Sequence, residues 1–375
     1  MKKDKLTNAY KGKNVYITGI TGFKGGWLAL MLYHLGANVF GIGLEPEEKD
    51  GIFYKAKIDE IAKVTIGDIV APANESRLIT SMIQANPDYI FHMAAQPIVS
   101  EGYIDPFNTF NVNIMGTVML HEVIRGLRLP ASKEDLSTGN SIKIDDENLS
   151  CKRISVVNIT TDKVYEETNR PLKEDDRLHG FDPYSLSKSC SDMISSAYRD
   201  ALQSPHYIST MRAGNVIGGG DMSVNRIVPD IIRSVQTRET LEIRSPHSVR
   251  PYQHVFDANI AYLWIALLQK QNKDIQSEYN IGPESSQTME THELVEGMKK
   301  HLDFDWKNTG QSIGKESDYL ALDNSKLKST GWTPAFPTNE KVVSSVANWY
   351  NNCIKGNDMQ KYTLEQIKEA FNSYE

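Results

Sequence analysis

Cysteine is scarce in this chain of 375 residues, and long apolar runs are absent. The three cysteines, Cys151, Cys190 and Cys353, stand far apart without paired spacing, which argues against a disulfide framework or zinc site and favours a reducing compartment. No stretch is apolar and long enough to span a bilayer, and the first residues lack the apolar core of a signal peptide. The nine histidines show no metal-like clustering. We therefore expect a cytoplasmic protein that holds no metal.

Positive charge is also in deficit. The chain has 41 Lys and Arg residues against 48 Asp and Glu residues, a formal net charge of −7. Such a chain lacks the basic footprint that binds nucleic acid or an anionic membrane, so neither is expected as a partner. Its length allows a large buried core and predicts two lobes.

A glycine turn near the N-terminus is the first positive signal. The apolar run Val15–Thr18 leads into Gly19-x-x-Gly22-x-x-Gly25, and an apolar helical pattern follows. Strand, glycine turn and helix form the context of a dinucleotide fingerprint, whose glycines permit the turn, the approach of a pyrophosphate and the packing of helix on strand. The free N–H groups of the helix N-terminus would face the phosphates.

Glu45 indicates which dinucleotide is bound. It ends the next predicted strand, 37–44, after the glycine turn. A carboxylate there would accept hydrogen bonds from the ribose hydroxyls and repel a 2′-phosphate, which favours NAD over NADP. The alternative is an ordinary loop carboxylate before Pro46.

Tyr184 and Lys188, four residues apart, suggest the chemistry. One helical turn puts both on one face, where the ammonium would lower the tyrosine pKa from about 10 and prepare it to take a proton from a substrate hydroxyl. Alone, this spacing more often marks a half-buried tyrosine on a solvated helix face. The glycine turn, and the tripeptide Thr161-Asp162-Lys163 upstream, reverse that balance.

Strand and helix patterns alternate through the first half of the chain, which predicts an α/β fold with a doubly wound parallel sheet. Three candidate segments, Gly19–Gly25, Ala94–Gln96 and Thr161–Lys163, each follow a predicted strand. Since open α/β sheets bind ligands beyond the carboxyl ends of their strands, these segments should share one crevice.

The pattern loosens after about residue 211. We expect residues 1–211 to form a Rossmann-like NAD-binding domain, and 212–375 to form mainly a smaller mixed lobe for the substrate, with some segments returning to the first domain. Residues 131–150 are polar, acidic and too long for an ordinary helix-to-strand connection. They predict a surface insertion with no part in chemistry; the alternative is a partner-binding segment.

Seven stretches carry a family resemblance: 18–25, 91–97, 113–117, 182–185, 212–221, 226–230 and 250–255. Through them the chain, from about Lys13 to Trp349, resembles extended short-chain dehydrogenases/reductases that act on nucleotide sugars. Within that superfamily it is most similar to the CDP-glucose 4,6-dehydratases, whose catalytic tripeptide ends in Lys, as at Lys163, where dTDP- and GDP-sugar dehydratases usually have Glu.

Three residues depart from that family's pattern. Gly26, Val164 and Tyr252 stand where Ser, Cys and Trp are usual. None removes a group that the chemistry needs, and only Tyr252 bears on the preference for base and sugar.

The resemblance implies three sets of site residues. The catalytic set is Thr161, Asp162, Lys163, Tyr184 and Lys188. The set implied to bind NAD is Gly19, Thr21, Gly22, Phe23, Lys24, Gly25, Glu45, Asp68, Ile69, Ala94, Ala95, Gln96, Asn113, Tyr184 and Lys188. The set implied to bind the nucleotide sugar is Gln96, Thr161, Asn215, Arg226 and Arg250.

The resemblance also implies an internal redox cycle. Tyr184 takes the proton of the C4 hydroxyl as hydride passes to NAD, while Thr161 hydrogen-bonds the same oxygen. A base then removes the C5 proton, protonated Asp162 supplies a proton to the departing C6 hydroxyl, and hydride returns at C6. Lys163 is either the C5 base, which requires a neutral amine, or a cation that stabilises the enolate.

Two alternatives remain beside the dehydratase. A nucleotide-sugar epimerase or decarboxylase of the same superfamily would share the glycine turn and Tyr184 but would not need Asp162 and Lys163. A silent NAD-binding regulator would need none of them. The superfamily further implies a homodimer, formed through the helix from Asn113 and the helix bearing Tyr184. The stripe Met193, Ile194, Ala197 and Tyr198 on the second helix fits either a dimer interface or the core.

Overall fold

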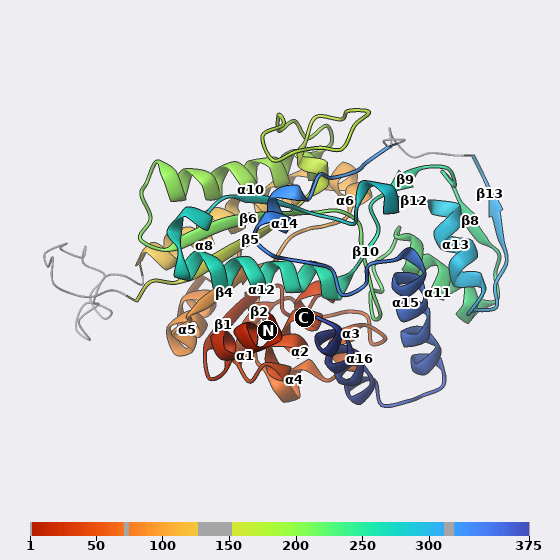
Figure 1. The fold of residues 1–375 in the computed structure, drawn as a ribbon, viewed down its shortest axis with the longest axis horizontal. Coiled ribbons are helices and arrows are strands. Elements are labelled where there is room, and N and C mark those ends of the chain that lie inside the picture. Colours follow the sequence, from red (N-terminus) through yellow and green to blue (C-terminus); the bar gives the residue numbers. More distant parts are fainter. Residues whose placement is uncertain (1, 71–74, 127–151, 311–318, 375) are drawn as a thin grey trace, which may run out of the picture.

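Seven parallel strands form the centre of the protein in this computed structural model, which describes residues 2–70, 75–126, 152–310 and 319–374 (Figure 1). The strand order is β11-β6-β5-β4-β1-β2-β3. The strands are β1 Asn14–Thr18, β2 Asn38–Gly43, β3 Lys63–Ile66, β4 Tyr89–His92, β5 Ser155–Thr161, β6 Tyr207–Ala213 and β11 Glu278–Ile281. The direction of winding reverses between β1 and β4, as in a dinucleotide-binding fold, so the predicted α/β, doubly wound sheet is confirmed.

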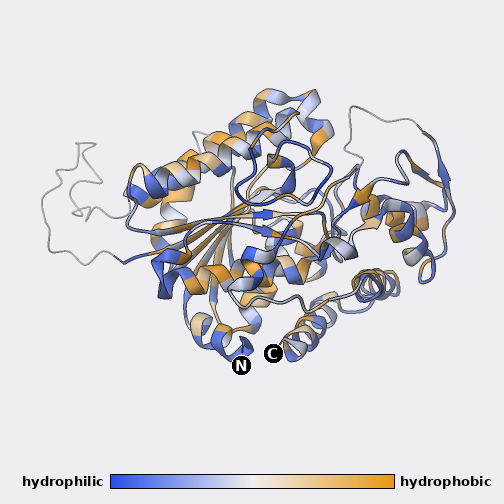
Figure 2. Ribbon diagram, turned by 45° about the horizontal axis from the view of Figure 1, so that its top comes forward, coloured by the Kyte–Doolittle hydropathy of each residue, from blue (hydrophilic) through white to orange (hydrophobic). Residues whose placement is uncertain are grey.

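Successive side chains of β1 point to opposite faces of the sheet and pack into two separate cores. Val15 and Ile17 of β1 point into the larger core, with the helices α2 and α12. Tyr16, between them, points to the opposite face, into a smaller core with α5 and α8. This period of two matches the pleat of a strand, and it explains why the β1 sequence is apolar at every position from Val15 to Ile17. Figure 2 shows the apolar sides of the helices turned toward the sheet.

The helices are of very unequal length. The longer ones are α1 Lys2–Tyr10, α2 Phe23–His34, α5 Glu75–Ala85, α8 Gly116–Gly126, α10 Pro183–Asp200, α11 Ile227–Thr237, α12 Val255–Gln271, α13 Thr291–Lys299, α15 Asn339–Ile354 and α16 Met359–Ser373. The short ones are α3 Ile52–Lys55, α4 Ile58–Ile61, α6 Val99–Ile104, α7 Pro106–Phe110 and α14 Ser325–Ser329. Among the described helices, none is both long and apolar enough to cross a membrane.

A second lobe lies to one side of the sheet, at the right of Figure 1. It contains α11, α13 and α15 and three pairs of short strands: β7 Val216–Ile217 with β10 Gln253–His254, β8 Leu241–Ile243 with β13 Trp306–Asn308, and β9 Val249–Arg250 with β12 Met289–Glu290. Between these segments the chain returns to the sheet through α12 and β11, and it ends in α16, which packs on α2. The predicted boundary at 211 falls inside β6.

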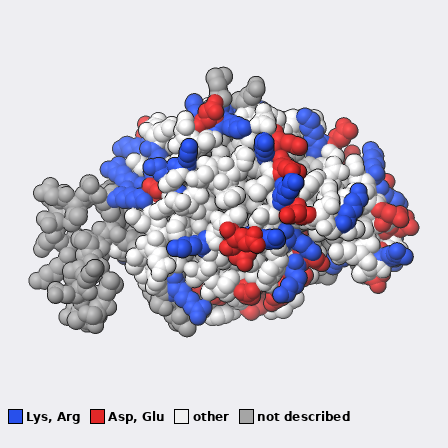
Figure 3. All heavy atoms as spheres, turned by 90° about the horizontal axis from the view of Figure 1, so that it is seen from below, with Lys and Arg blue, Asp and Glu red and all other residues white. Residues whose placement is uncertain are grey.

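The predicted insertion at residues 131–150 lies outside the described residues. On the face shown in Figure 3, basic and acidic side chains are intermixed.

Candidate active site

The glycine turn forms as the sequence predicts. Gly19 has a positive φ of 75°, and a Cβ built on it would lie 2.8 Å from the Ala94 nitrogen. A Cβ on Gly25 would collide with the Gly19 carbonyl oxygen. Gly22 is the N-cap of α2 and offers no side-chain cap, so the N–H groups of the first turn, from Phe23 on, are not satisfied by a cap. The turn therefore packs tightly against Met93 and Ala94, which follow β4, and no side chain larger than hydrogen fits at Gly19 or Gly25.

Two predicted cofactor residues lie at the ends of the next strands. Glu45 follows β2 with its side chain exposed, and its carboxylate accepts a 2.8 Å hydrogen bond from the Tyr54 hydroxyl. Asp68 follows β3, and its Oδ1 accepts a 3.1 Å bond from the Val70 nitrogen, while Ile69 is buried beside Gly116. Both carboxylates therefore lie along the carboxyl edge of the sheet, but away from the predicted catalytic residues.

Gln96 and Asn113 hold two elements of the site together. The buried Asn113 lies in the single π-turn Asn111–Met115, and its side chain makes three hydrogen bonds: it accepts one from the Gln96 nitrogen (2.9 Å) and donates to the Gln96 oxygen (3.1 Å) and to Ser187 Oγ (2.8 Å). The Gln96 side chain donates to Thr109 Oγ1 (2.7 Å) and accepts from the Ile98 nitrogen (2.5 Å). Asn113 therefore ties the loop after β4 to α10, and the Gln96 side chain ties the same loop to α7.

The tripeptide Thr161-Asp162-Lys163 begins at the last residue of β5 and continues in the 3-10 turn Asp162–Val164. Thr161 Oγ1 donates a 2.9 Å hydrogen bond to Asp162 Oδ1. Asp162 is buried, and its Oδ2 has no hydrogen-bond partner among the described residues. Burial raises the pKa of Asp162, although the Lys163 charge and the Thr161 hydroxyl act in the opposite direction. The buried carboxyl with an open oxygen is suited to carry a proton.

Tyr184 lies in the first turn of α10, which Asp182 caps by accepting a 3.0 Å bond from the Ser185 nitrogen. Lys188, one turn on, is buried and donates a 2.8 Å bond from Nζ to the Ile159 oxygen. Burial lowers the pKa of Lys188 to about 8. The two residues share a face, as predicted.

The predicted lowering of the Tyr184 pKa is wrong, because the surrounding protein raises it. Burial raises the pKa of Tyr184 to about 12, and the hydrogen bond with Thr161 and the charge of Arg226 offset this only in part. A lysine charge by itself would lower the tyrosine pKa, but burial removes water from around the phenol and raises it. The buried Lys188 ammonium donates to the backbone of β5.

Three of the five predicted substrate residues, Asn215, Arg226 and Arg250, belong to the second lobe or to the segment leading into it. Arg226 precedes α11, and its Nη1 lies 3.1 Å from Asp221 Oδ2. Arg250 lies in β9, is mostly buried, and its charge lowers the pKa of Asp162. Asn215 is half-buried, and its backbone oxygen accepts a 2.9 Å bond from the Gln253 nitrogen. The charge of Arg250 therefore acts on Asp162, and the charge of Arg226 acts on Tyr184 and Lys24.

Comparison with known proteins identifies the family to which the chain belongs. The sequence profile of the family described as GDP-mannose 4,6 dehydratase matches residues 16–344. The chain belongs to this dehydratase family. It is 34% identical to the CDP-glucose 4,6-dehydratase of Salmonella typhimurium over 96% of this chain and 97% of that protein. It is 24% identical to the dTDP-glucose 4,6-dehydratase of Xanthomonas campestris over 94% and 97% of the two chains. The predicted resemblance is confirmed.

Solved structures show the same fold. MoeE5 in complex with UDP-glucose and NAD superposes with a TM-score of 0.72 at 20% identity, over 91% of this chain and 99% of that one. The dTDP-glucose 4,6-dehydratase of Bacillus anthracis, in complex with NAD, gives 0.69 at 20% identity, over 93% and 100%. The dehydratase fold is therefore shared over nearly the whole chain.

Sequence analysis of this dehydratase missed the surroundings of Lys24. The Lys24 ammonium lies over the ring of Tyr262, 5.9 Å from its centroid, and makes no ion pair with the described residues. Burial, and then the charges of Lys188 and Arg226, lower the pKa of Lys24 to about 7. Tyr262 is fully buried, and its hydroxyl has no partner among the described residues. The signal in the sequence was a phenol in the apolar middle of α12, between Ile260 and Leu268.

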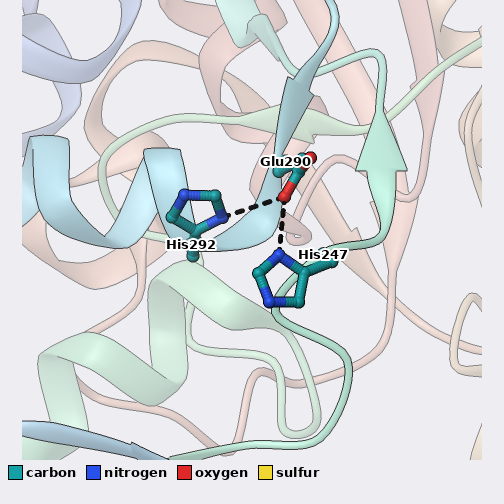
Figure 4. A group of neighbouring side chains, drawn as sticks. All are labelled: His247, Glu290 and His292. Carbon is teal, nitrogen blue, oxygen red and sulfur yellow. Dashed lines mark hydrogen bonds and ion pairs between the residues drawn. The ribbon is translucent and has the colours of Figure 1, made fainter.

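A histidine cluster corrects the expectation that the histidines are dispersed. His247, Glu290 and His292 lie together on the second lobe of this dehydratase (Figure 4). His247 lies about 40 residues before Glu290 and His292 in sequence, and the antiparallel pairing of Val249 with Glu290 brings it to them. Sequence spacing could not show this, because it depends on which strands pair.

Proposed function

We propose that this chain catalyses the NAD-dependent 4,6-dehydration of a nucleotide-activated hexose. The proposed substrate is CDP-D-glucose, the proposed product is CDP-4-dehydro-6-deoxy-D-glucose, and the pathway supplies deoxysugars for surface polysaccharide. The observation that carries the proposal is the buried Asp162 carboxyl, with its open oxygen and raised pKa, beside Thr161 and Tyr184. A simple C4 epimerase has no step that requires this acid.

The cofactor site fits NAD. A Cβ at Gly19 or Gly25 would collide with the backbone of Ala94 or of the turn itself, so glycine is what permits this tight turn, and the uncapped first turn of α2 offers N–H donors to a pyrophosphate. When bound, NAD accepts hydride from C4 and returns it at C6. We propose that residues 1–211, completed by α12, β11 and α16, hold this cofactor, and that most of 212–375 holds the sugar nucleotide.

In the oxidation step, Tyr184 acts as the base toward the C4 hydroxyl. Tyr184 and Thr161 are hydrogen-bonded neighbours, and both hydroxyls would bind the C4 oxygen of the substrate, in bonds that strengthen as the C4–O bond gains carbonyl character. Lys188 lies one turn away, fixed by the Ile159 oxygen. A pKa near 8 allows Lys188 to release or accept a proton at working pH.

In the elimination step, Asp162 gives its proton to the departing C6 hydroxyl. Burial raises the pKa of Asp162, which favours the protonated carboxyl, and the Thr161 hydroxyl donates to Oδ1, which leaves Oδ2 for the substrate. Lys163 follows directly in the 3-10 turn and acts at C5, as base or as cation for the enolate. Arg226 and Arg250 supply the paired donors that a pyrophosphate requires, and Asn215 lies beside them.

The direct test is incubation of the purified protein with CDP-glucose, dTDP-glucose, GDP-mannose and UDP-glucose. A 4-keto-6-deoxy product is recognised by its absorbance in alkali. We expect that product from CDP-glucose at the highest kcat/KM. Formation of a C4 epimer alone, from any of the four, would contradict the proposal.

Glu45→Ala is expected to relax the choice of cofactor. Glu45 lies at the end of β2 with an exposed carboxylate, and its loss removes both an acceptor for the ribose hydroxyls and the repulsion of a 2′-phosphate. The ratio of NAD to NADP affinity should fall by about tenfold or more, since one hydrogen bond to a charged group contributes about 1.5–3 kcal/mol. Titration of both dinucleotides by calorimetry measures the ratio.

Tyr54→Phe is the matched control for this variant, because it removes the hydroxyl that Glu45 accepts and leaves the carboxylate. If the wild-type protein binds NADP as well as NAD, Glu45 does not act on the ribose.

We propose that the chain forms a homodimer through α8 and α10. Large apolar side chains are exposed on α10 and on the elements packed against it: Met193 is 59% exposed, Phe107 on α7 is 81% exposed, and Leu186 and Met115 are also exposed. Several large exposed apolar side chains on neighbouring elements favour an interface. Of the predicted stripe, Met193 and Ala197 are exposed, while Ile194 and Tyr198 are half-buried and face inward.

Met193→Glu is expected to shift the dimer toward monomer, because it places a charge in the proposed interface. Light scattering at micromolar concentration should give the mass of two chains for the wild type and a lower average mass for the variant. Ile83→Glu, which alters an exposed apolar residue on α5 at a distance from α10, is the control. A wild-type monomer at that concentration contradicts the proposal.

We also propose that the enzyme works in the cytoplasm. NAD and nucleotide sugars are intracellular metabolites, and Cys190 and Cys353 are free thiols in the structure.

A further inference from the structure

The β9–β12 ribbon brings two imidazoles to one carboxylate. Glu290 pairs with Val249 across the ribbon, so His247, two residues before Val249, and His292, two residues after Glu290, flank the same carboxylate (Figure 4). His247 Nδ1 lies 2.8 Å and His292 Nδ1 lies 3.1 Å from Glu290 Oε2. The three ligand atoms lie within 4.8 Å of one another.

One of these nitrogens has an unmet bonding capacity. Nδ1 of His292 is buried and has no hydrogen-bond partner among the described residues, although the Glu290 oxygen is only 3.1 Å away, so the two atoms are close without hydrogen-bond alignment. A buried ring nitrogen that faces a carboxylate oxygen without such a bond costs stability unless something else engages it. A cation between the three atoms would engage all of them.

Glu290 is held in place by a second role. It is the N-cap of α13 and forms a capping box with Glu293, so its carboxylate is already oriented. A carboxylate has about four lone-pair sites, so the capping bond leaves room for a metal ligand. The capping box therefore fixes the central ligand of the cluster rather than competing with it.

The donor set selects the class of metal. Two imidazole nitrogens and one carboxylate suit Zn²⁺ and its neighbours Ni²⁺ and Cu²⁺, whereas Mg²⁺ and Ca²⁺ prefer oxygen ligands alone. Tetrahedral Zn²⁺ with bonds of about 2.0–2.2 Å spaces its ligands about 3.4 Å apart, so the cluster needs only small shifts, and the exposed His247 can make them.

We propose that His247, Glu290 and His292 form a binding site for one Zn²⁺-class divalent cation, with water in the fourth position. The site stands apart from the proposed catalytic chemistry, which uses no metal. Its consequence is structural, because it joins the segment before β9 to the start of α13. Thr291 already bridges these segments through Ser248 Oγ (3.0 Å) and the Tyr252 hydroxyl (3.2 Å), and Arg250 lies in the same ribbon.

Calorimetric titration of the full chain with ZnCl₂ tests the site. We expect one equivalent to bind, and His247→Ala and His292→Ala each to weaken the affinity by about tenfold or more, since even outer-shell changes cost metal sites 10–100-fold. His301→Ala, an exposed histidine of the same lobe whose ring has no partner among the described residues, should bind Zn²⁺ as the wild type does. MgCl₂ should give no binding.

A second measurement guards against variants that fold poorly. His247 is 77% exposed, so its removal should not unfold the protein, and hydrogen exchange can verify this directly. Zn²⁺ should slow exchange at residues 247–250 and 289–292 in the wild type and not in His247→Ala. No Zn²⁺ binding by the wild type, or binding that both histidine variants retain undiminished, would overturn the proposal. Neither outcome bears on the dehydratase activity.

Discussion

Replacing Tyr184 by Phe is expected to abolish both the oxidation at C4 and the overall dehydration. The change removes the hydroxyl that takes the first proton and breaks the hydrogen bond with Thr161, while the ring that packs in α10 remains. Loss of a positioned general base costs about 10²–10⁴-fold in rate. Single-turnover mixing with CDP-glucose should therefore show neither the NADH absorbance nor the alkali-sensitive product within the time of a wild-type turnover.

The matched control lies on the same helix. Tyr198→Phe removes a hydroxyl that donates to Glu122 Oε1 at 2.5 Å, more than three turns from Tyr184, and should leave both steps within about twofold of the wild type. Normal NADH formation in Tyr184→Phe would assign the first proton transfer to another group, of which the Lys24 amine and the unpartnered Tyr262 hydroxyl are candidates.

Asp162→Asn and Lys163→Met are expected to separate the two halves of the reaction. Both act after the first hydride transfer, so C4 oxidation should continue while elimination slows by about 10²–10⁴-fold. The buried Asp162 has an open oxygen that an amide cannot use to donate an acidic proton. Enzyme-bound NADH should then accumulate with little 4-keto-6-deoxy product. Asp175→Asn, an exposed carboxylate in the loop after Lys163, is the control.

Lys163→Arg distinguishes the two roles left open for that residue. Arginine keeps the positive charge but cannot act as a base near neutral pH. Recovery of elimination in Lys163→Arg relative to Lys163→Met would identify a cation that stabilises the enolate, and no recovery would identify the C5 base. If instead the Asp162 and Lys163 variants turn over normally and CDP-glucose yields only its C4 epimer, the protein is an epimerase.

The local parts of this site were predictable from the sequence, because they depend on neighbours along the chain. The glycine turn follows from the spacing of its three glycines, of which Gly19 and Gly25 have no room for a Cβ, and the shared face of Tyr184 and Lys188 follows from the helical period. The parallel sheet followed from alternating strand and helix patterns.

The parts that could not be predicted depend on contacts between distant segments. The pKa of Tyr184 rises because tertiary packing removes water, a quantity that spacing does not contain. The Gln96 side chain bonds Thr109 of α7 and the Ile98 nitrogen, and its backbone bonds Asn113 in the π-turn Asn111–Met115, contacts that residue spacing does not reveal. The histidine cluster exists only because β9 pairs with β12.

The position of α16 has a consequence for how the chain folds during synthesis. The last helix, Met359–Ser373, covers α2, and Phe371 is fully buried with its ring stacked on His34 at 5.3 Å. A ribosome releases α2 long before α16, so the side of α2 that α16 covers stays exposed until α16 has emerged. Since nascent domains fold from the N-terminus as units, the proposed NAD-binding half of this protein cannot finish folding before the sugar-binding half has emerged.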